Sequence, residues 1–182
     1  TSGNVIGDKS VGGIAGANMT IGFTPNPPLI KKSFTDATIS GKKNVGGLAG
    51  FQRSKALISK SYSESKVSGE NNVGGVVGKI TFDARVKNSF SDGKIGGVNN
   101  VGGLVGQASD SRIGDSYSAS EVSGEGSVGG IIGLISGSNE TNEPSISDVY
   151  WDIEVMSRQG ESRVPIGLTT DQMTGESAKN ML

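Results

Sequence analysis

A six-residue motif, Val-Gly-Gly-apolar-apolar-Gly, occurs five times in this chain and constrains its fold more than any other feature. Successive copies start 34, 28, 28 and 27 residues apart, so the chain repeats with a period close to 28 residues. Such a period is typical of architectures in which each repeat packs against its neighbours. The copies begin with Val11, Gly12, Gly13; Val45, Gly46, Gly47; Val73, Gly74, Gly75; Val101, Gly102, Gly103; and Val128, Gly129, Gly130.

Three further columns of apolar residues keep the same register. They are Ile30, Ile58, Val86, Ile113 and Ile146; the aromatic residues Phe34, Tyr62, Phe90, Tyr117 and Tyr150; and Ile39, Val67, Ile95, Val122 and Val155. Short β-branched clusters separated by Gly, Ser and Asn are typical of strands and turns. We therefore predict an all-β parallel β-solenoid of about five 28-residue coils, with three short strands in each coil. Right-handed winding is expected, because parallel crossovers favour it.

The glycines and asparagines of the motif predict the corners of each coil. Val45 and Leu48 are three residues apart, so both can point inward only if the backbone bends at Gly46 and Gly47. Glycine accepts a positive φ at such a corner. A corner or bulge is also expected at Gly41 and at the equivalent residues Gly69, Gly97 and Gly124.

Asn44, Asn72 and Asn100 each precede a copy of the motif. Two interpretations of this column are open. The side chains can stack as a hydrogen-bonded ladder through successive coils, or asparagine stands there because it favours turns.

Composition excludes several classes of function. Gly (30) and Ser (26) make up 56 of 182 residues, or 31%, which alone would suggest disorder, but much of the glycine falls into the columns described above. The absence of His and Cys excludes a Ser-His-Asp triad, the usual zinc sites and disulfides. A net charge of −1 gives no overall electrostatic case for nucleic acid, and no apolar run is long enough to enter a membrane. We predict no catalytic residue, no cofactor and no metal.

The aromatic column can lie on either side of the sheet. If residues 61–67 form one regular strand, Tyr62 shares an outer face with Glu64 and Lys66, and the column becomes an exposed stripe. The alternative is a stacked ladder inside the core, which we expect because aromatic side chains dominate core energetics and this chain has few.

Two sets of charged residues are also candidates for contacts. An acidic column, Asp36, Glu64, Asp92 and Asp152, could bind calcium, but Lys66 and Lys94 lie two residues on, so a solvated mixed-charge face is expected. Arg85 and Arg112 occupy equivalent sites in adjacent coils, either as a cationic pair or as solubilising residues.

The repeats differ mainly at one corner, where residues 17–29 and 134–145 form long insertions that contain prolines. Such insertions can mark a binding side or simply decorate the terminal coils. We assign the solenoid to residues 1–156 and a cap or linker to 157–182, in which Thr169 and Gln172 predict a capping box and a short helix. The first residues, Thr1 to Asn4, contain neither an initiator Met nor a signal peptide, so we expect a longer parent protein.

The runs Gly-Leu-Ala-Gly at 47–50 and Gly-Leu-Val-Gly at 103–106, with their variants at 13–16, 75–78 and 130–133, resemble the GLUG repeat. GLUG repeats occur in large bacterial surface and secreted proteins, including adhesin-like proteins and immunoglobulin-A-cleaving zinc metallopeptidases. The resemblance implies a β-solenoid displayed outside the cell or on its surface. The zinc motif of those peptidases contains His, so any such chemistry would lie elsewhere in the parent protein.

We therefore predict a non-catalytic structural and adhesive segment that acts as a rigid spacer and binding scaffold. Its expected partners are a host glycoprotein, an immunoglobulin or a glycan, and flanking domains of the same chain. Two alternatives stay open: an accessory region that holds the substrate of an immunoglobulin-A-specific metallopeptidase, and a carbohydrate-active β-helix of the lyase or glycosidase class.

Overall fold

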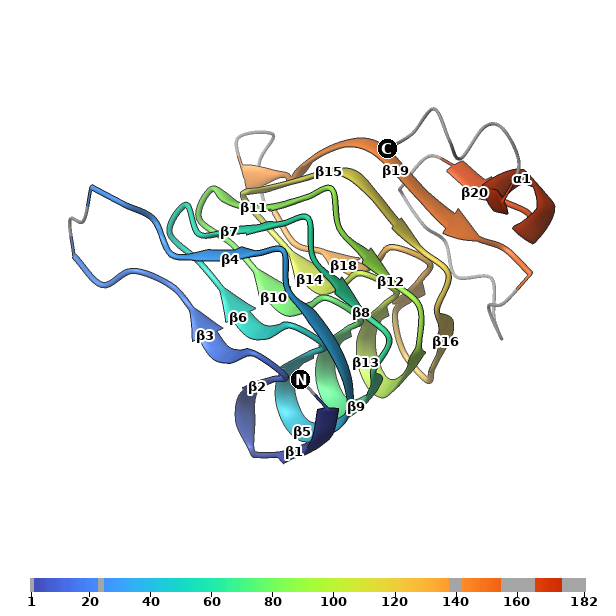
Figure 1. The fold of residues 1–182 in the computed structure, drawn as a ribbon, viewed down its shortest axis with the longest axis horizontal. Coiled ribbons are helices and arrows are strands. Elements are labelled where there is room, and N and C mark those ends of the chain that lie inside the picture. Colours follow the sequence, from blue (N-terminus) through green and yellow to red (C-terminus); the bar gives the residue numbers. More distant parts are fainter. Residues whose placement is uncertain (1, 23–24, 138–141, 155–165, 175–182) are drawn as a thin grey trace.

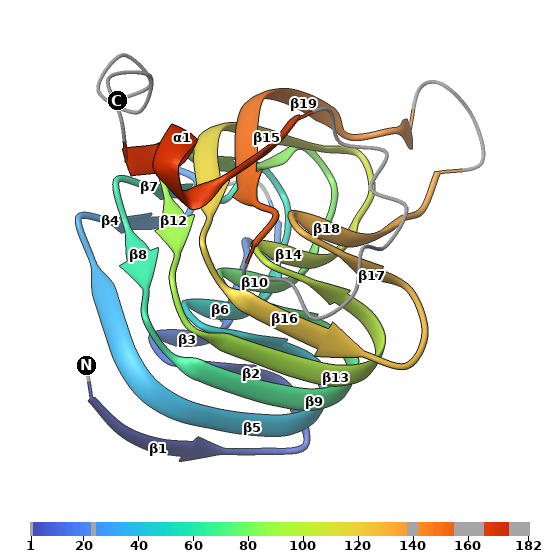
Figure 2. The ribbon, with the colours of Figure 1, turned by 90° about the vertical axis from the view of Figure 1, so that its right-hand side faces the viewer.

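The computed structural model describes residues 2–22, 25–137, 142–154 and 166–174. Within these ranges the chain forms strands β1 to β20 and one short helix, α1 (Thr170–Thr174). All the pairings between these strands are parallel, and the strands lie on three faces that wind around a narrow core (Figures 1 and 2). The predicted all-β parallel solenoid with a short C-terminal helix is confirmed.

The strands are grouped here by face. Face A consists of β1 (Ser2–Ile6), β2 (Lys9–Gly12), β5 (Phe34–Gly46), β9 (Lys66–Gly74), β13 (Lys94–Gly102), β16 (Glu121–Gly124) and β17 (Val128–Gly129). Face B consists of β3 (Ala15–Asn18), β6 (Ala49–Gln52), β10 (Val77–Ile80), β14 (Val105–Ala108) and β18 (Ile132–Ile135). Face C consists of β4 (Leu29–Lys31), β7 (Leu57–Ser59), β8 (Tyr62–Ser63), β11 (Ala84–Lys87), β12 (Phe90–Ser91), β15 (Ser111–Ser118), β19 (Ser145–Asp152) and β20 (Ile166–Leu168), together with the first residues of β5.

The coils stack in the register that the repeat predicts. On face A the motif valines form one column, in which Val11 pairs with Val45, Val45 with Val73, Val73 with Val101, and Val101 with Val128. The five copies of the motif are joined by four pairings, so the solenoid has about four turns. This is fewer than the about five coils expected, because each turn runs from one copy of the motif to the next. The right-handed winding stays a prediction.

The Gly-Gly pairs form the corner between face A and face B, as predicted. Strand β5 ends at Gly46, the chain bends at Gly47 and Leu48, and β6 begins at Ala49, with Val45 and Leu48 both fully buried. The expected reason was wrong, however, because these glycines do not have a positive φ. A Cβ on Gly46 would collide with backbone atoms of Ala49, Val77 and Gly78, so glycine is required by close backbone approach.

At Gly41, Gly69 and Gly97 the strands of face A continue through the predicted corner, and β5 curves around the coil (Figure 2). A Cβ on Gly41 would lie 2.8 Å from Val11 and 3.1 Å from Val45. These glycines therefore leave room for the motif valines on the inner side of a curved strand.

The asparagine column is both a ladder and a turn. Asn72 donates from Nδ2 to Asn44 Oδ1 at 2.7 Å, and Asn100 donates from Nδ2 to Asn72 Oδ1 at 2.8 Å. All three residues have a positive φ of 55–56°, a conformation that asparagine tolerates better than most residues. Both interpretations left open by the sequence are therefore correct.

The interior of the solenoid contains two apolar clusters. One lies between faces B and C and includes Ile58, Leu48 and Val77, and the other lies inside the curve of face A and includes Ile39 and Val45. Between them runs a column of small buried residues, Thr35, Ser63, Ser91 and Ser118. The Ser63 side chain lies where a Cβ on Gly47 would be, so this part of the core has room only for a small residue.

The C-terminal segment covers part of the last coil. The column of small residues ends in Trp151, which is 8% exposed and packs against Gly130. Strand β20 pairs with residues 150–152 of β19 and covers the edge of β19 that faces away from β15. The predicted capping box is present: Gln172 N donates to Thr169 Oγ1 at 3.3 Å, and Thr169 N donates to Gln172 Oε1 at 2.9 Å. Val155 and residues 175–182 lie outside the described residues.

Candidate functional site

The aromatic column forms a stacked ladder on the outer surface of face C. The ring centroids of Phe34 and Tyr62 are 5.4 Å apart, those of Tyr62 and Phe90 are 4.7 Å apart, and those of Phe90 and Tyr117 are 4.9 Å apart, with interplanar angles of 14°, 2° and 3°. Tyr150 follows in register on β19. We call Phe34, Tyr62, Phe90, Tyr117 and Tyr150 the aromatic ladder.

The expectation that this ladder is buried was wrong. Phe34 is 51% exposed, and the other four aromatic residues are half-buried. Residues 61–67 alternate in burial through β8, the two residues after it and the start of β9, with Ser61, Ser63 and Ser65 buried and the residues between them facing outward. Opposite Gly47, Gly75 and Gly103 the narrow interior accepts a serine but has no room for a ring, so the aromatic side chains of these coils occupy the outer face. Only at the end of the stack does a ring, that of Trp151, occupy the equivalent inner position against Gly130.

The stacking decides which part of each ring is available for contact. In a stacked column the faces of the inner rings are covered by their neighbours, so a partner meets ring edges and, at Tyr62, Tyr117 and Tyr150, the phenol hydroxyls. Ring edges carry the positive part of the aromatic quadrupole. The ladder is therefore better suited to edge contacts and hydrogen bonds than to stacking against the flat face of a sugar.

An acidic column runs beside the aromatic ladder. Asp36, Glu64 and Asp92 are exposed and lie two residues beyond Phe34, Tyr62 and Phe90. Burial raises the pKa of the Tyr117 phenol above its ordinary value, and the nearby carboxylates of Asp92 and Glu64 raise it further. Ladder and carboxylates are therefore close enough to form one surface, which we call the aromatic–acidic stripe.

The fourth predicted member of the acidic column, Asp152, is instead buried. Its Oδ2 accepts a hydrogen bond from Thr170 Oγ1 at 2.6 Å, and its Oδ1 accepts one from Glu154 N at 2.9 Å. Asp152 thus anchors α1 and the last coil. In the part of the chain that the structure describes, no group of three or more Asp or Glu residues could hold a metal ion.

Of the two lysines expected to neutralise the acids, Lys94 instead pairs with another carboxylate. Lys94 Nζ lies 2.7 Å from Glu121 Oε2, one coil further on, and this hydrogen bond raises the pKa of Lys94. Together with Asp92, Gly93 and Ala119, these two residues line an open depression of about 470 Å³. The depression adjoins the acidic column through Asp92. It is hollow because Gly93 and Ala119 have small side chains at positions where earlier coils carry Ser65 and Glu64. This depression could have been predicted from the aligned repeats, in which Gly93 and Ala119 replace larger residues of the other coils.

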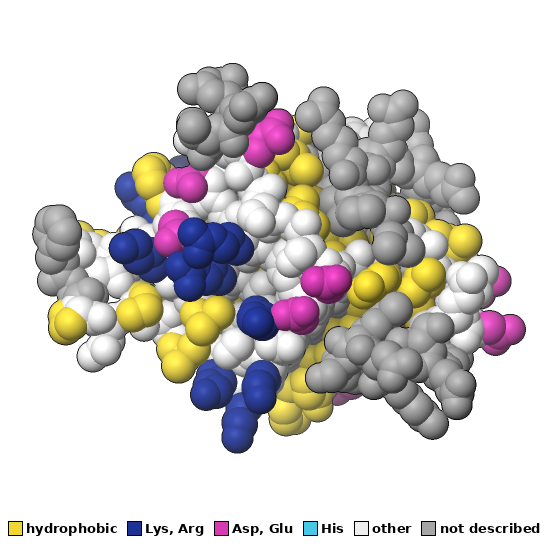
Figure 3. Space-filling view, turned by 90° about the horizontal axis from the view of Figure 1, so that it is seen from above, with side chains coloured by type: hydrophobic (Ala, Val, Ile, Leu, Met, Phe, Trp, Pro, Cys, Tyr) yellow, Lys and Arg dark blue, Asp and Glu magenta, His cyan; other side chains and the backbone are white. Residues whose placement is uncertain are grey.

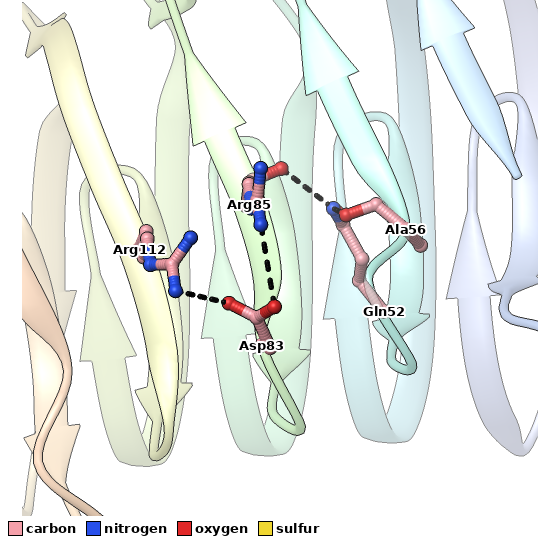
Figure 4. A network of polar contacts seen from close by, with 5 residues as sticks. All are labelled: Gln52, Ala56, Asp83, Arg85 and Arg112. Carbon is pink, nitrogen blue, oxygen red and sulfur yellow. Dashed lines mark hydrogen bonds and ion pairs between the residues drawn. The ribbon is translucent and has the colours of Figure 1, made fainter. Parts of the chain in front are cut away.

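Arg85 and Arg112 pair in register on β11 and β15, as their equivalent positions predict. Asp83 lies between them, with Oδ2 at 3.2 Å from Arg85 Nη2 and Oδ1 at 3.0 Å from Arg112 Nη2 (Figure 4). Beneath Arg85, the buried Gln52 donates from Nε2 to Arg85 O at 2.7 Å and to Ala56 O at 2.9 Å, which ties the strand to the neighbouring corner (Figure 4).

The two predicted insertions leave the solenoid at the same corner, between face B and face C. One joins β3 to β4 and the other joins β18 to β19, so they lie in the first and the last coil (Figure 1). Four coil steps of about 4.8 Å separate the two corners. The described residues of the two insertions therefore leave the stack at its opposite ends.

Comparisons with known proteins support the repeat. A family model, "The GLUG motif", matches residues 69–96, which span one period of 28 residues. A search of curated proteins gave no match. No helix in the described ranges has the length and apolar character needed to cross a membrane.

A crystal structure described as that of a "putative immunoglobulin A1 protease from Bacteroides ovatus" has a TM-score of 0.74 and 19% sequence identity to this chain. The match covers 91% of this chain and 57% of that protein, so this chain spans little more than half of its length. At this identity the likeness shows a common fold. The chain thus carries a GLUG repeat, as its sequence predicts, in a β-solenoid whose fold it shares with that protein.

Proposed function

We propose that this chain is a non-catalytic segment of a bacterial secreted or cell-surface protein, where it acts as a rigid spacer and binding scaffold. The observation that carries the proposal is the aromatic–acidic stripe, because a half-exposed row of aromatic side chains beside uncovered carboxylates is typical of a contact surface. The GLUG motif at 69–96 supports the extracellular setting.

Rigidity follows from the hydrogen bonding between coils. Each inner coil is joined to both neighbours by parallel strands on all three faces, and the asparagine ladder adds side-chain bonds along the same axis. A bend of the stack would break several of these bonds at once, so the segment holds its ends at a fixed separation. Four coil steps correspond to about 19 Å.

The stripe favours a protein partner with basic side chains. Asp36, Glu64 and Asp92 supply negative charge, and the tyrosine hydroxyls supply hydrogen bonds at the same surface. We propose a host glycoprotein or an immunoglobulin as the class of partner. The likeness to a protein described as an immunoglobulin A1 protease favours the second candidate function, a region that helps to hold the antibody substrate of such an enzyme.

A binding screen with immunoglobulin A, other host glycoproteins and a glycan array tests the proposal. The variant D36N/E64Q/D92N removes three charges from the stripe and keeps the aromatic ladder. The control E70Q/D110N/E125Q removes three charges from other positions. We expect the first variant to lose at least about tenfold in affinity and the control to bind like the parent chain. Equal losses in both variants, or no binding by the parent chain, would exclude the stripe as a contact surface.

Incubation of the purified chain with polysaccharides and with immunoglobulin A tests the non-catalytic part of the proposal. We expect no cleavage. Cleavage that survives repurification of the chain would overturn this part and favour the carbohydrate-active or peptidase alternative.

A further inference from the structure

Six basic side chains lie together on face C, on the opposite side of the aromatic ladder from the acidic column. All six are exposed, and a gathering of Lys and Arg is visible on the face seen from above (Figure 3). We call this set the basic cluster: Lys31, Lys32, Lys60, Arg85, Lys87 and Arg112. The overall charge of −1 conceals it.

Strand register arranges the basic cluster in columns parallel to the solenoid axis. Lys31 and Lys87 both pair with Ser59, so they lie in one column two coil steps apart. Arg85 and Arg112 are neighbours in a second column. From the coil of Lys31 to that of Arg112 there are three steps of about 4.8 Å, so the cluster extends about 14 Å along the stack.

Lys32 and Lys60 form a third column, at the turn that precedes the aromatic ladder. The backbone nitrogen of Lys32 donates to Ser59 O, and that of Lys60 donates to Lys87 O, which places the two turns one above the other. Both lysines have a φ of 51°, in the left-handed region. The later coils have Asn88, Asp115 and Asp148 at this turn, residue types that accept this conformation more readily. Lysine is therefore not the residue that the turn itself favours, which points to a role for its charge.

Carboxylates nearby neutralise only part of the basic cluster. Asp83 bridges the two arginines, and Asp115 lies 3.2 Å from Lys87 Nζ. Within the described ranges, Lys31, Lys32 and Lys60 form no ion pair. Six positive charges against two pairing carboxylates leave a positive surface over the first coils.

Charge is also unevenly distributed along the whole chain, with an excess of positive charge in the first coils. Residues 1–61 contain eight Lys or Arg and two Asp, whereas residues 90–149 contain two Lys or Arg and eight Asp or Glu. The first coils are therefore positive and the last coils negative. Such a field steers an anionic partner toward the N-terminal half of face C.

We propose that the basic cluster binds a linear sulfated polysaccharide that lies along the solenoid axis. Parallel columns of cations match a chain with repeated negative groups, and the guanidinium groups of Arg85 and Arg112 suit the planar recognition of oxyanions. The cluster lies on the outer side of a sheet, and among the described residues no helix or two-stranded ribbon projects from it to enter a groove of a nucleic-acid duplex.

Retention on immobilised heparin, eluted with a sodium chloride gradient, tests this proposal. The variant K32N/K60N gives both turns the residue present at Asn88, so the fold should be kept or slightly strengthened. The control K9N/K43N removes two exposed lysines that pair in register on face A of the same two coils. We expect the parent chain to be retained, K32N/K60N to elute at lower salt with about a tenfold loss of affinity, and the control to elute near the parent chain.

Three results would overturn the proposal. The parent chain could pass through the column unretained. The two double variants could elute at the same lowered salt, which would show a general charge effect instead of a site on face C. A DNA duplex of matched charge could displace the protein as effectively as free heparin, which would exclude selectivity for a sulfated polysaccharide. Urea unfolding of both variants provides the check that each is folded.

Discussion

Replacement of Gly75 by Ala tests the physical reason for the motif glycines. Gly75 is buried at the corner between β9 and β10. A Cβ at this position would lie 2.6 Å from the Cβ of Ser91 and still closer to the carbonyl oxygen of Gly103. Backbone atoms cannot move aside as a side chain can, so the two coils must separate locally.

The expected cost follows from these contacts. Overpacking of a filled core costs about 1–3 kcal/mol. The oxygen of Gly103 accepts hydrogen bonds from Gly75 N at 3.1 Å and from Ser91 Oγ at 2.6 Å. Loss of both bonds adds about 1 kcal/mol each. We therefore expect Gly75→Ala to lower the free energy of unfolding by about 3–5 kcal/mol, a large share of the stability of an ordinary domain.

Gly96→Ala is the matched control, because Gly96 lies in strand β13 of the neighbouring coil. A Cβ there would meet Ser123 Oγ at 3.5 Å, an ordinary contact. This change should be neutral or stabilise by up to about 1 kcal/mol, since alanine restricts the unfolded chain. Urea unfolding, followed by circular dichroism and by the fluorescence of the single Trp151, measures both. The steric explanation is refuted if the free energy of unfolding of Gly75→Ala is within about 0.5 kcal/mol of that of the parent chain, or if Gly96→Ala destabilises the fold as much as Gly75→Ala does.

Three further changes test other columns. Asn72→Ala loses the ladder bonds to Asn44 and Asn100 and places alanine at a φ of 56°, so it should destabilise by about 2–3 kcal/mol in urea. Asn72→Gly also loses the ladder bonds but accepts the positive φ, so it should destabilise by about 1 kcal/mol less than Asn72→Ala. Equal destabilisation by the two variants would show that the positive φ at this position is unimportant. Phe90→Ala removes two stacked contacts and should cost about 1–3 kcal/mol, whereas Phe90→Tyr should be neutral in thermal unfolding. In an ultraviolet titration Tyr117 should ionise above its ordinary pKa of about 10, and the late-titrating phenol should vanish in Tyr117→Phe.

The sign of the pH dependence follows from the raised pKa of Tyr117. The folded state favours the neutral phenol, so this residue contributes stability below the unfolded-state pKa. The contribution is lost as the pH rises through the higher folded-state pKa. The parent chain should therefore lose more stability than Tyr117→Phe in alkaline solution, and identical losses would contradict the assignment.

Much of the fold could be predicted because a stacked repeat makes sequence register and spatial register the same. The pairing of Val45 with Val73, the corner after Gly46 and the asparagine ladder all follow from positions 28 residues apart. The capping box at Thr169 could also be predicted, because its hydrogen bonds join residues only three apart.

The candidate site was predicted less well, because its properties depend on which way side chains face. The aromatic column was identified, but its burial was predicted wrongly. Nothing in the sequence indicates that the space opposite Gly47 accepts only Ser63, since that limit arises from the approach of two backbones. The basic cluster was missed because Lys31, Lys60 and Arg112 are far apart in the sequence and meet only through the coils.

The sequence by itself thus determined the period, the strands and corners of each coil, and the columns that stack. These features depend on spacing along the chain and on the local preferences of Gly, Asn and β-branched residues. The tertiary structure alone decided which columns face outward, because the width of the interior is set by the packing of one face against another. It placed the rings of the aromatic ladder and the basic cluster on the surface, where both can meet a partner.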